Sequence, residues 1–214
     1  MLRRQFGAVS SMPPLVLQDF SDRVPQGSDG CREISLGIVV SKTRSQYPIF
    51  QNYHPTEFDM IRPIAPDDTT ALIALAEATG LFGPHETEEL ALMLADHFGG
   101  ENSQDIWLTD DDGGLVGVAY VAPERMTDGT WNLYLIAVHP DRQRQGRGAA
   151  LLAHVEQMLS QRGDRVLLVE TSGLESFEYV RAFYRKSGYD EEARIREFYK
   201  AGEDKIVFRK ALGK

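Results

Sequence analysis

Apolar and polar residues follow regular patterns only after about residue 60, and these patterns predict an alternation of strands and helices. Short apolar runs bounded by turn residues are typical of strands, and apolar residues three or four apart are typical of amphipathic helices. The predicted strands cover 61–64, 106–109, 115–121, 131–139, 166–170, 192–199 and 205–210. The predicted helices cover 66–80, 90–98, 146–161 and 177–186. This order indicates one α/β domain over residues 60–214.

Residues 1–59 lack this periodicity and form a candidate N-terminal extension. They mix serine, glycine, proline and glutamine with isolated apolar residues, and only Glu33–Ser41 has the pattern of a strand. A segment of this composition buries too little apolar surface to hold a fixed structure by itself. We therefore expect an extension that is poorly ordered or loosely packed.

The chain of 214 residues carries a formal net charge of −9, and the acidic excess is unevenly spread. Residues 1–60 hold six basic and six acidic side chains, so the whole excess falls in 61–214. An acidic body argues against nucleic-acid binding and favours a cationic partner, although a solvated acidic surface explains the same charge.

Composition also restricts location and cofactors. The single cysteine, Cys31, cannot form an internal disulfide, which fits a reducing, cytoplasmic setting. No run of about 18 apolar residues is present, so no membrane-spanning helix is expected. The five histidines lack the spacing of metal ligands, so no metal site is expected. Whether the chain is a monomer or a homodimer stays open.

The segment after the predicted strand 131–139 carries the most specific signal. Its glycines, Gly146 and Gly148, open a helix that lacks a Ser, Thr, Asp or Asn cap at the expected position. Helix starts leave N–H groups unpaired and favour anions, and glycine lets a ligand approach the backbone closely. We expect a phosphorylated ligand here, and the alternative is a glycine turn that only packs strand on helix.

Two common phosphate motifs do not fit this turn. The dinucleotide fingerprint needs a third glycine where Leu151 stands. The phosphate loop of nucleoside triphosphatases needs Gly-Lys followed by Ser or Thr, which is absent.

Over residues 60–210, the element order and the motifs IAVHPDRQRQGRGAALL and RAFYRKSGY make the chain resemble the GNAT superfamily of N-acetyltransferases, which use acetyl-coenzyme A (acetyl-CoA). The resemblance implies a mixed, splayed central β-sheet flanked by helices on both faces. It also implies that the coenzyme pantetheine pairs with the strand at Ile136, Ala137 and Val138. The pyrophosphate would lie on backbone amides of Gln143, Arg144, Gln145, Gly146, Arg147, Gly148 and Ala149.

The same resemblance suggests catalytic roles. Tyr184 would protonate the leaving thiolate, with a core-packing tyrosine as the alternative. Phe177, seven residues earlier, stands where the family commonly has an asparagine that reaches the pantetheine, so that contact is not expected here. A strand amide near Val138 would hold the oxyanion.

The choice of general base rests on position in the sequence. Glu170 ends a predicted strand, and Asn132 or Tyr134 could hold a water beside it. A purely structural Glu170 is the alternative. His139 precedes a proline at a strand end and is interpreted as a turn residue.

We expect the acceptor to enter between the first two helices and the open end of the sheet. The candidate walls of that pocket include Glu86 and Glu89 and the three aromatic residues Phe82, Trp131 and Tyr134. Aromatic and acidic groups together suit an ammonium ligand, although helix packing explains the same residues.

The predicted activity is acetyl transfer from acetyl-CoA to a primary amine by direct attack. The acceptor would be an amine-bearing small molecule or peptide, and its identity stays open. The rival hypothesis is a non-catalytic module that binds or senses an acyl-CoA.

Overall fold

The computed structural model describes residues 15–16, 60–80, 82–100 and 104–213. The chain divides into one compact unit of residues 1–19 with 60–214 and a second unit of residues 20–59. The predicted strand Glu33–Ser41 and, apart from residues 15–16, the extension 1–59 that was expected to be poorly ordered or loosely packed lie outside the described residues. The account below therefore concerns the first unit.

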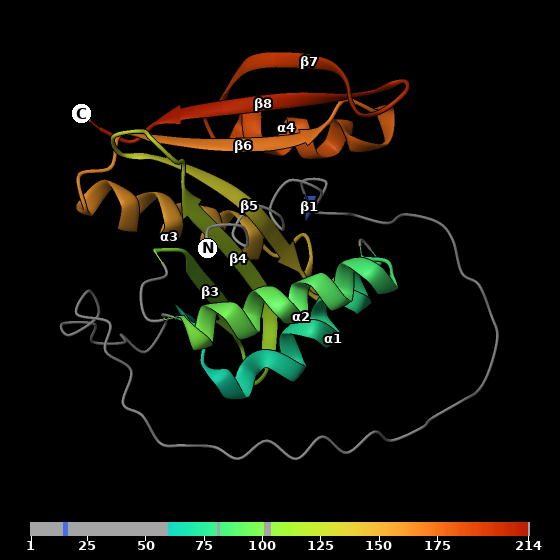
Figure 1. The fold of residues 1–214 in the computed structure, drawn as a ribbon, viewed down its shortest axis with the longest axis vertical. Coiled ribbons are helices and arrows are strands. Elements are labelled where there is room, and N and C mark those ends of the chain that lie inside the picture. The colour runs from blue at the N-terminus through green and yellow to red at the C-terminus, as the bar shows by residue number, and fades with distance from the viewer. Residues whose placement is uncertain (1–14, 17–59, 81, 101–103, 214) are drawn as a thin grey trace, which may run out of the picture. The chain divides into compact units, whose positions relative to one another are not determined.

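A mixed sheet forms the centre of this unit (Figure 1). Its strands run in the order β2-β3-β4-β5-β6-β8-β7, and β5 pairs with β6 in parallel while the other neighbours are antiparallel. The short strand β1 (Leu15–Val16) pairs in parallel with β5. The strand bounds are β2 Ile61–Pro63, β3 Ile106–Asp111, β4 Leu115–Pro123, β5 Thr130–Val138, β6 Val166–Ser172, β7 Asp190–Lys200 and β8 Glu203–Ala211.

Helices cover both faces of the sheet, as expected (Figure 1). Their bounds are α1 Thr69–Thr79, α2 Pro84–Gly99, α3 Arg147–Gln161 and α4 Glu178–Lys186. One core packs α1 and α2 against β3, β4 and β5 through Leu72, Leu94 and Trp107. The other core packs α3 and α4 against the opposite face through residues such as Leu152 and Val180. The alternation of side chains along each strand supplies both cores.

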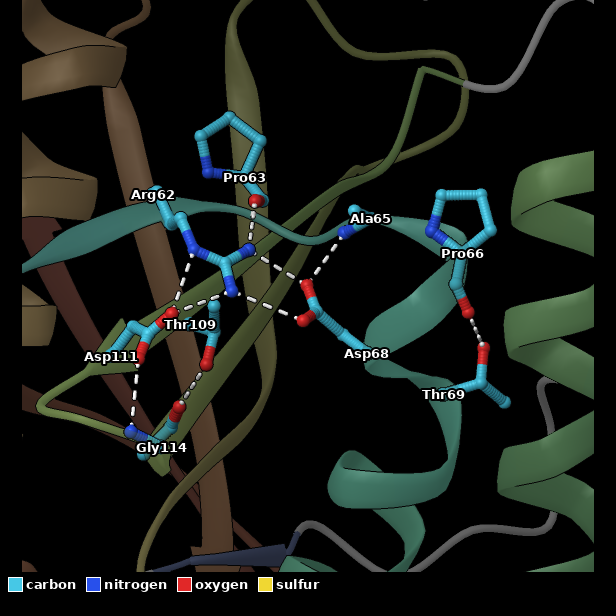
Figure 2. A network of polar contacts seen from close by, with 10 residues as sticks. Arg62, Pro63, Ala65, Pro66, Asp68, Thr69, Thr109, Asp111 and Gly114 are labelled. Carbon is cyan, nitrogen blue, oxygen red and sulfur yellow. Dashed lines mark hydrogen bonds and ion pairs between the residues drawn. The ribbon is translucent and has the colours of Figure 1, made fainter. Parts of the chain in front are cut away.

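A network around Arg62 on β2 holds one corner of the sheet (Figure 2). The guanidinium makes five hydrogen bonds: two to Asp111, two to Asp68 and one to the carbonyl of Pro63. Asp68 Oδ2 also accepts from the N–H of Ala65 at 2.7 Å. The Arg62 guanidinium therefore lowers the pKa of Asp68 and ties the start of α1 to β2 and β3.

Candidate active site

Strands β5 and β6 form a fork. Their parallel pairing runs from Thr130↔Val166 to Leu133↔Val169 and then stops. Past this apex, β5 continues to Val138, while β6 continues to Ser172 and pairs with β8. Figure 1 shows the two strands diverging. The structure thus confirms the splay implied by the family resemblance, and past the apex β6 no longer pairs with this backbone edge of β5.

The alternation of hydrogen bonds between β4 and β5 shows which β5 residues direct their backbone groups away from β4. The N–H of His139 donates to the carbonyl of Val116 at 2.8 Å, which fixes the hydrogen-bonded phase of the β4–β5 ladder. Because bonded pairs alternate in an antiparallel ladder, Ile136 and Val138 turn their N–H and C=O groups away from β4. Gln143 Nε2 donates to the Val138 carbonyl at 3.0 Å. In this structure β1 pairs Val16 with Ile136, on the edge predicted for the coenzyme arm.

A β-bulge at Tyr134 lies directly beside the apex. Val121 pairs with Leu133 and Tyr120 pairs with Leu135, so Tyr134 has no cross-strand partner. A bulge changes the direction of a side chain and leaves one residue without a partner on the neighbouring strand. Here that residue is Tyr134, which directly follows Leu133, the last β5 residue that pairs with β6.

The start of α3 presents unpaired backbone donors. Gly146 is its N-cap with φ of +81°, and no side chain caps the helix. The first helical bond runs from the N–H of Ala150 to the carbonyl of Gly146 at 2.9 Å, so the N–H groups of Arg147, Gly148 and Ala149 lack helical partners. A Cβ built on Gly146 meets no heavy atom within 4 Å. The turn is thus open to an anion on the side of Gly146.

The Arg147 side chain bonds to two aspartates of the β3–β4 hairpin. Its Nη1 donates to both carboxylate oxygens of Asp110 at 3.1 and 2.9 Å, and its Nη2 pairs with Asp112. The contribution of Arg147 to a ligand is therefore its backbone N–H, while its guanidinium fixes the helix start to the β3–β4 hairpin. The side chain of Gln145 also bonds within the turn, to the Asp141 carbonyl at 3.2 Å.

Tyr184 on α4 is fully buried, and its hydroxyl has no hydrogen-bond partner among the described residues. Its ring packs against that of Phe208, with 5.6 Å between centroids. Phe208 is the β8 partner of Val169, the last β6 residue paired with β5, so Tyr184 lies beside the apex of the fork. Burial raises the pKa of Tyr184, which keeps the hydroxyl protonated as a donor.

Two carboxylates lie near the apex in different surroundings. Glu170, the first β6 residue past the pairing, forms an ion pair with Lys205 at 3.0 Å. Glu124, just after β4, accepts hydrogen bonds at Oε1 from Asn132 Nδ2 at 3.1 Å and from the Tyr134 hydroxyl at 3.2 Å. Asn132 or Tyr134 was expected to hold a water beside Glu170. In the structure both side chains donate to Glu124, and Tyr134 also lies near Glu170.

Sequence reasoning did not select Glu124. The available signal was its place at the end of β4, where hairpin pairing brings it opposite the start of β5, with Asn132 and Tyr134 one strand away. Finding it requires the exact register between β4 and β5, which the predicted strand ranges do not supply.

The predicted acceptor walls are only partly assembled. Phe82 and Tyr134 both pack with the α1–α2 core. Trp131 packs in the opposite core, where Arg162 lies 4.7 Å from its ring centroid. Trp131 thus packs on the other face of the sheet from Tyr134, because residues three apart on a strand point to opposite faces.

The remaining predicted residues have structural contacts. His139 accepts from the N–H of Asp141 at 3.3 Å, as a turn residue would. Phe177 packs against the α3–α4 core. Glu89 faces His85 at 3.6 Å, and Glu86 lies beside Gly83. The described part of the chain holds no group of three or more metal-binding side chains placed to share an ion. It also holds no helix long and apolar enough to cross a membrane.

A family model and a solved structure both indicate the same family of proteins. The model of the acetyltransferase (GNAT) domain family matches residues 102–191. A GNAT-family protein from Desulfovibrio desulfuricans is 34% identical with a TM-score of 0.67, and the match covers 71% of this chain and 98% of that protein. Curated proteins gave no match.

Two further solved structures share the fold. The ribosomal-protein-S18-alanine N-acetyltransferase of Escherichia coli is 25% identical with a TM-score of 0.56, covering 72% of this chain and 94% of its own. An aminoglycoside 6'-N-acetyltransferase complexed with coenzyme A is 20% identical with a TM-score of 0.58, covering 71% of this chain and 96% of its own.

Proposed function

The chain belongs to the GNAT family of acetyltransferases, and we propose that it moves the acetyl group of acetyl-CoA to a primary amine by direct attack. The observation that carries this proposal is the buried hydroxyl of Tyr184 beside the apex of the β5–β6 fork, which has no hydrogen-bond partner in the part of the chain that the structure describes. A buried hydroxyl without a partner is costly, and a sulfur at the fork would supply the missing acceptor.

Residues of this chain fit acetyl-CoA as co-substrate. The uncapped start of α3 offers the N–H groups of Arg147, Gly148 and Ala149, and the space beside Gly146 admits a diphosphate. The fork-facing groups of Ile136 and Val138 offer a strand edge to the amides of the pantetheine arm. Because β1 contacts the same edge at Ile136, we expect coenzyme binding to displace Leu15–Val16 from β5.

The thioester supplies an activated acetyl group, and this chain supplies the proton transfers. An amine near pKa 10.4 must lose a proton before it attacks, which costs about 4–5 kcal/mol at pH 7. As the C–N bond forms and the C–S bond breaks, the departing thiolate takes the hydroxyl proton of Tyr184. The second N–H proton of the amine then restores the tyrosine. A fork-facing N–H near Val138 would stabilise the oxyanion.

The acceptor side of the proposal rests on charge. The domain that carries the fork contains the whole acidic excess of the chain. Glu170 is the first β6 residue past the apex, and the Glu124 carboxylate contacts Tyr134, the next β5 residue after the apex. A cationic amine on a small molecule or a peptide suits this surface. We infer a cytoplasmic location from the single cysteine, which fits a reducing compartment.

The test is release of free CoA thiol from acetyl-CoA by the full chain, with spermidine, lysine, kanamycin and a hexapeptide with a free N-terminus as acceptors. We expect turnover of at least one amine that saturates with acetyl-CoA. Binding of CoA by calorimetry without turnover of any amine would favour the non-catalytic acyl-CoA module. Absence of both binding and turnover would contradict the function altogether.

A further inference from the structure

We propose that Glu124 binds the acceptor ammonium and takes its proton before attack. This inference rests on the proposed acetyl transfer and adds the residue that activates the amine. It assigns to the end of β4 a role that the sequence prediction gave to Glu170 on β6.

The Glu124 carboxylate is held from β5 and is otherwise open to a cation. Both of its hydrogen bonds, from Asn132 and from Tyr134, reach Oε1. Among the residues that the structure describes, no arginine, lysine or histidine forms an ion pair with Glu124. A carboxylate positioned by neutral donors keeps its charge available to a ligand.

Glu170 differs in this respect. Lys205, which is largely buried, donates to Glu170 Oε2 at 3.0 Å and also lies 3.7 Å from the ring centroid of Phe198. A carboxylate that compensates a buried ammonium cannot take a proton without leaving that ammonium unpaired. Of the two carboxylates, Glu124 is therefore the one free to accept a proton.

Glu124 also contacts the fork through Tyr134, although its own backbone N–H bonds the Thr130 carbonyl at the other end of the β5–β6 pairing. Its partner Tyr134 is the bulged residue directly past the last β5–β6 pair, and Glu170 holds the matching position on β6. Burial, followed by the charges of Glu124 and Glu170, raises the pKa of Tyr134 to about 12. The hydroxyl thus stands near both carboxylates and stays protonated, as a fixed donor to Glu124.

A second polar atom at this place lacks a partner. Asn132 is 2% exposed, and its Oδ1 accepts no hydrogen bond from the described residues, although its Nδ2 donates to Glu124. An ammonium group has three donors and no acceptor, so it suits both the Glu124 carboxylate and this amide oxygen. The two acceptors on neighbouring residues are therefore consistent with a primary ammonium as the ligand.

The proposed step balances. The acceptor R–NH3+ gives one proton to the Glu124 carboxylate, and the neutral amine attacks the thioester carbonyl. Glu124 then returns its proton to solvent. The products are the N-acetyl amine, CoA thiol and one released proton.

The structural alternative is that Glu124 only ties the β4–β5 hairpin together, and E124Q separates the two roles. Glutamine keeps an acceptor oxygen for Asn132 and Tyr134 but cannot take the proton. D128N is the matched control, because Asp128 is exposed on the same hairpin loop. E170Q is made in parallel. Turnover is measured with the best acceptor among spermidine, lysine, kanamycin and the hexapeptide.

We expect E124Q to lower kcat about 100-fold at pH 7, with the KM for acetyl-CoA and the melting temperature unchanged. For an acceptor amine near pKa 10.4 its rate should rise about tenfold per pH unit between pH 7 and 9, because only amine that is already neutral reacts. For a peptide N-terminus near pKa 7.8 the rise should level off above about pH 8. D128N should stay within about twofold of wild type. If only E170Q lost turnover, or if E124Q stayed within about threefold of wild-type turnover at every pH, the role of Glu124 would be overturned while the proposed function would stand. A wild type that acetylates none of the four amines would overturn the proposed function with it.

Discussion

The corner around Arg62 and the fork between β5 and β6 belong to one sheet but treat their polar groups in opposite ways. At the corner, Arg62 makes five hydrogen bonds and its partners bond further groups. At the fork, Asn132 Oδ1, Thr171 Oγ1 and the Tyr184 hydroxyl are buried with no partner among the described residues. Folded chains satisfy nearly all buried polar groups, so these three atoms at the fork are candidates for contact with a ligand.

Strand pairing explains the difference. Strands β3 and β4 pair from Ile106↔Val121 to Asp111↔Leu115, so no backbone edge between them is left open. Strands β5 and β6 share only four paired positions before they part. The corner around Arg62 thus stabilises the domain through internal contacts. The β5–β6 fork instead leaves hydrogen-bond donors and acceptors available to ligands. Each prediction below tests one side of this contrast.

Replacing Tyr184 with phenylalanine should have the largest effect. We expect kcat to fall at least 100-fold, because the thiolate loses its proton donor. The free energy of unfolding should stay equal or rise slightly, because the change removes an unsatisfied buried hydroxyl. Steady-state kinetics and chemical denaturation measure the two quantities. Turnover close to wild type, or a loss explained entirely by weaker CoA binding, would show that Tyr184 is only a core residue.

Replacing Arg62 with methionine should lower stability and leave coenzyme binding unchanged. The free energy of unfolding should fall by about 2 kcal/mol, because the variant leaves Asp68 and Asp111 without their shared partner. CoA affinity should not change. Urea denaturation and calorimetry provide the two measurements.

The stability loss in the Arg62 variant should depend on pH. Arg62 lowers the pKa of Asp68 in the folded state, so the stabilisation is complete above the ordinary aspartate value of 3.8 and declines as the pH falls below it. The difference between wild type and variant should therefore shrink under acidic conditions. A difference that grows toward low pH would contradict this assignment.

Two glycines at opposite ends of α3 give a matched pair. Gly146 and Gly163 both have positive φ, +81° and +86°, and a Cβ built on either meets no heavy atom within 4 Å. Alanine at either position should therefore cost a similar amount of stability, about 1 kcal/mol. Only Gly146→Ala should weaken CoA binding, by about tenfold, because its methyl group enters the space of the diphosphate. Equal CoA affinity in the two variants would remove the turn from the coenzyme site.

Local patterns predicted the features that depend on local chemistry. The order of strands and helices follows from apolar periodicity, and the glycine turn is continuous in sequence, so both were recognised from the chain alone. The splay needed the family resemblance, because nothing in the residues of β5 shows where its partner ends.

The rest depended on contacts between distant segments. Arg147 bonds Asp110, 37 positions away, and only the folded chain shows that its guanidinium is unavailable to a ligand. Glu124 meets Asn132 and Tyr134 through hairpin register and a bulge. Strand alternation alone already separates Trp131 from Tyr134, so the opposite faces of these two residues could be predicted from the sequence.

Hydrogen exchange measured residue by residue, with and without CoA, tests the central claim most directly: the turn at α3 and the open edge of β5 form one coenzyme site. We predict slower exchange at the N–H groups of Val138, Arg147, Gly148 and Ala149 when CoA is added. Leu15–Val16 should exchange faster, because the coenzyme takes their place on β5. Unchanged exchange at both the turn and Val138 under saturating CoA would contradict the account.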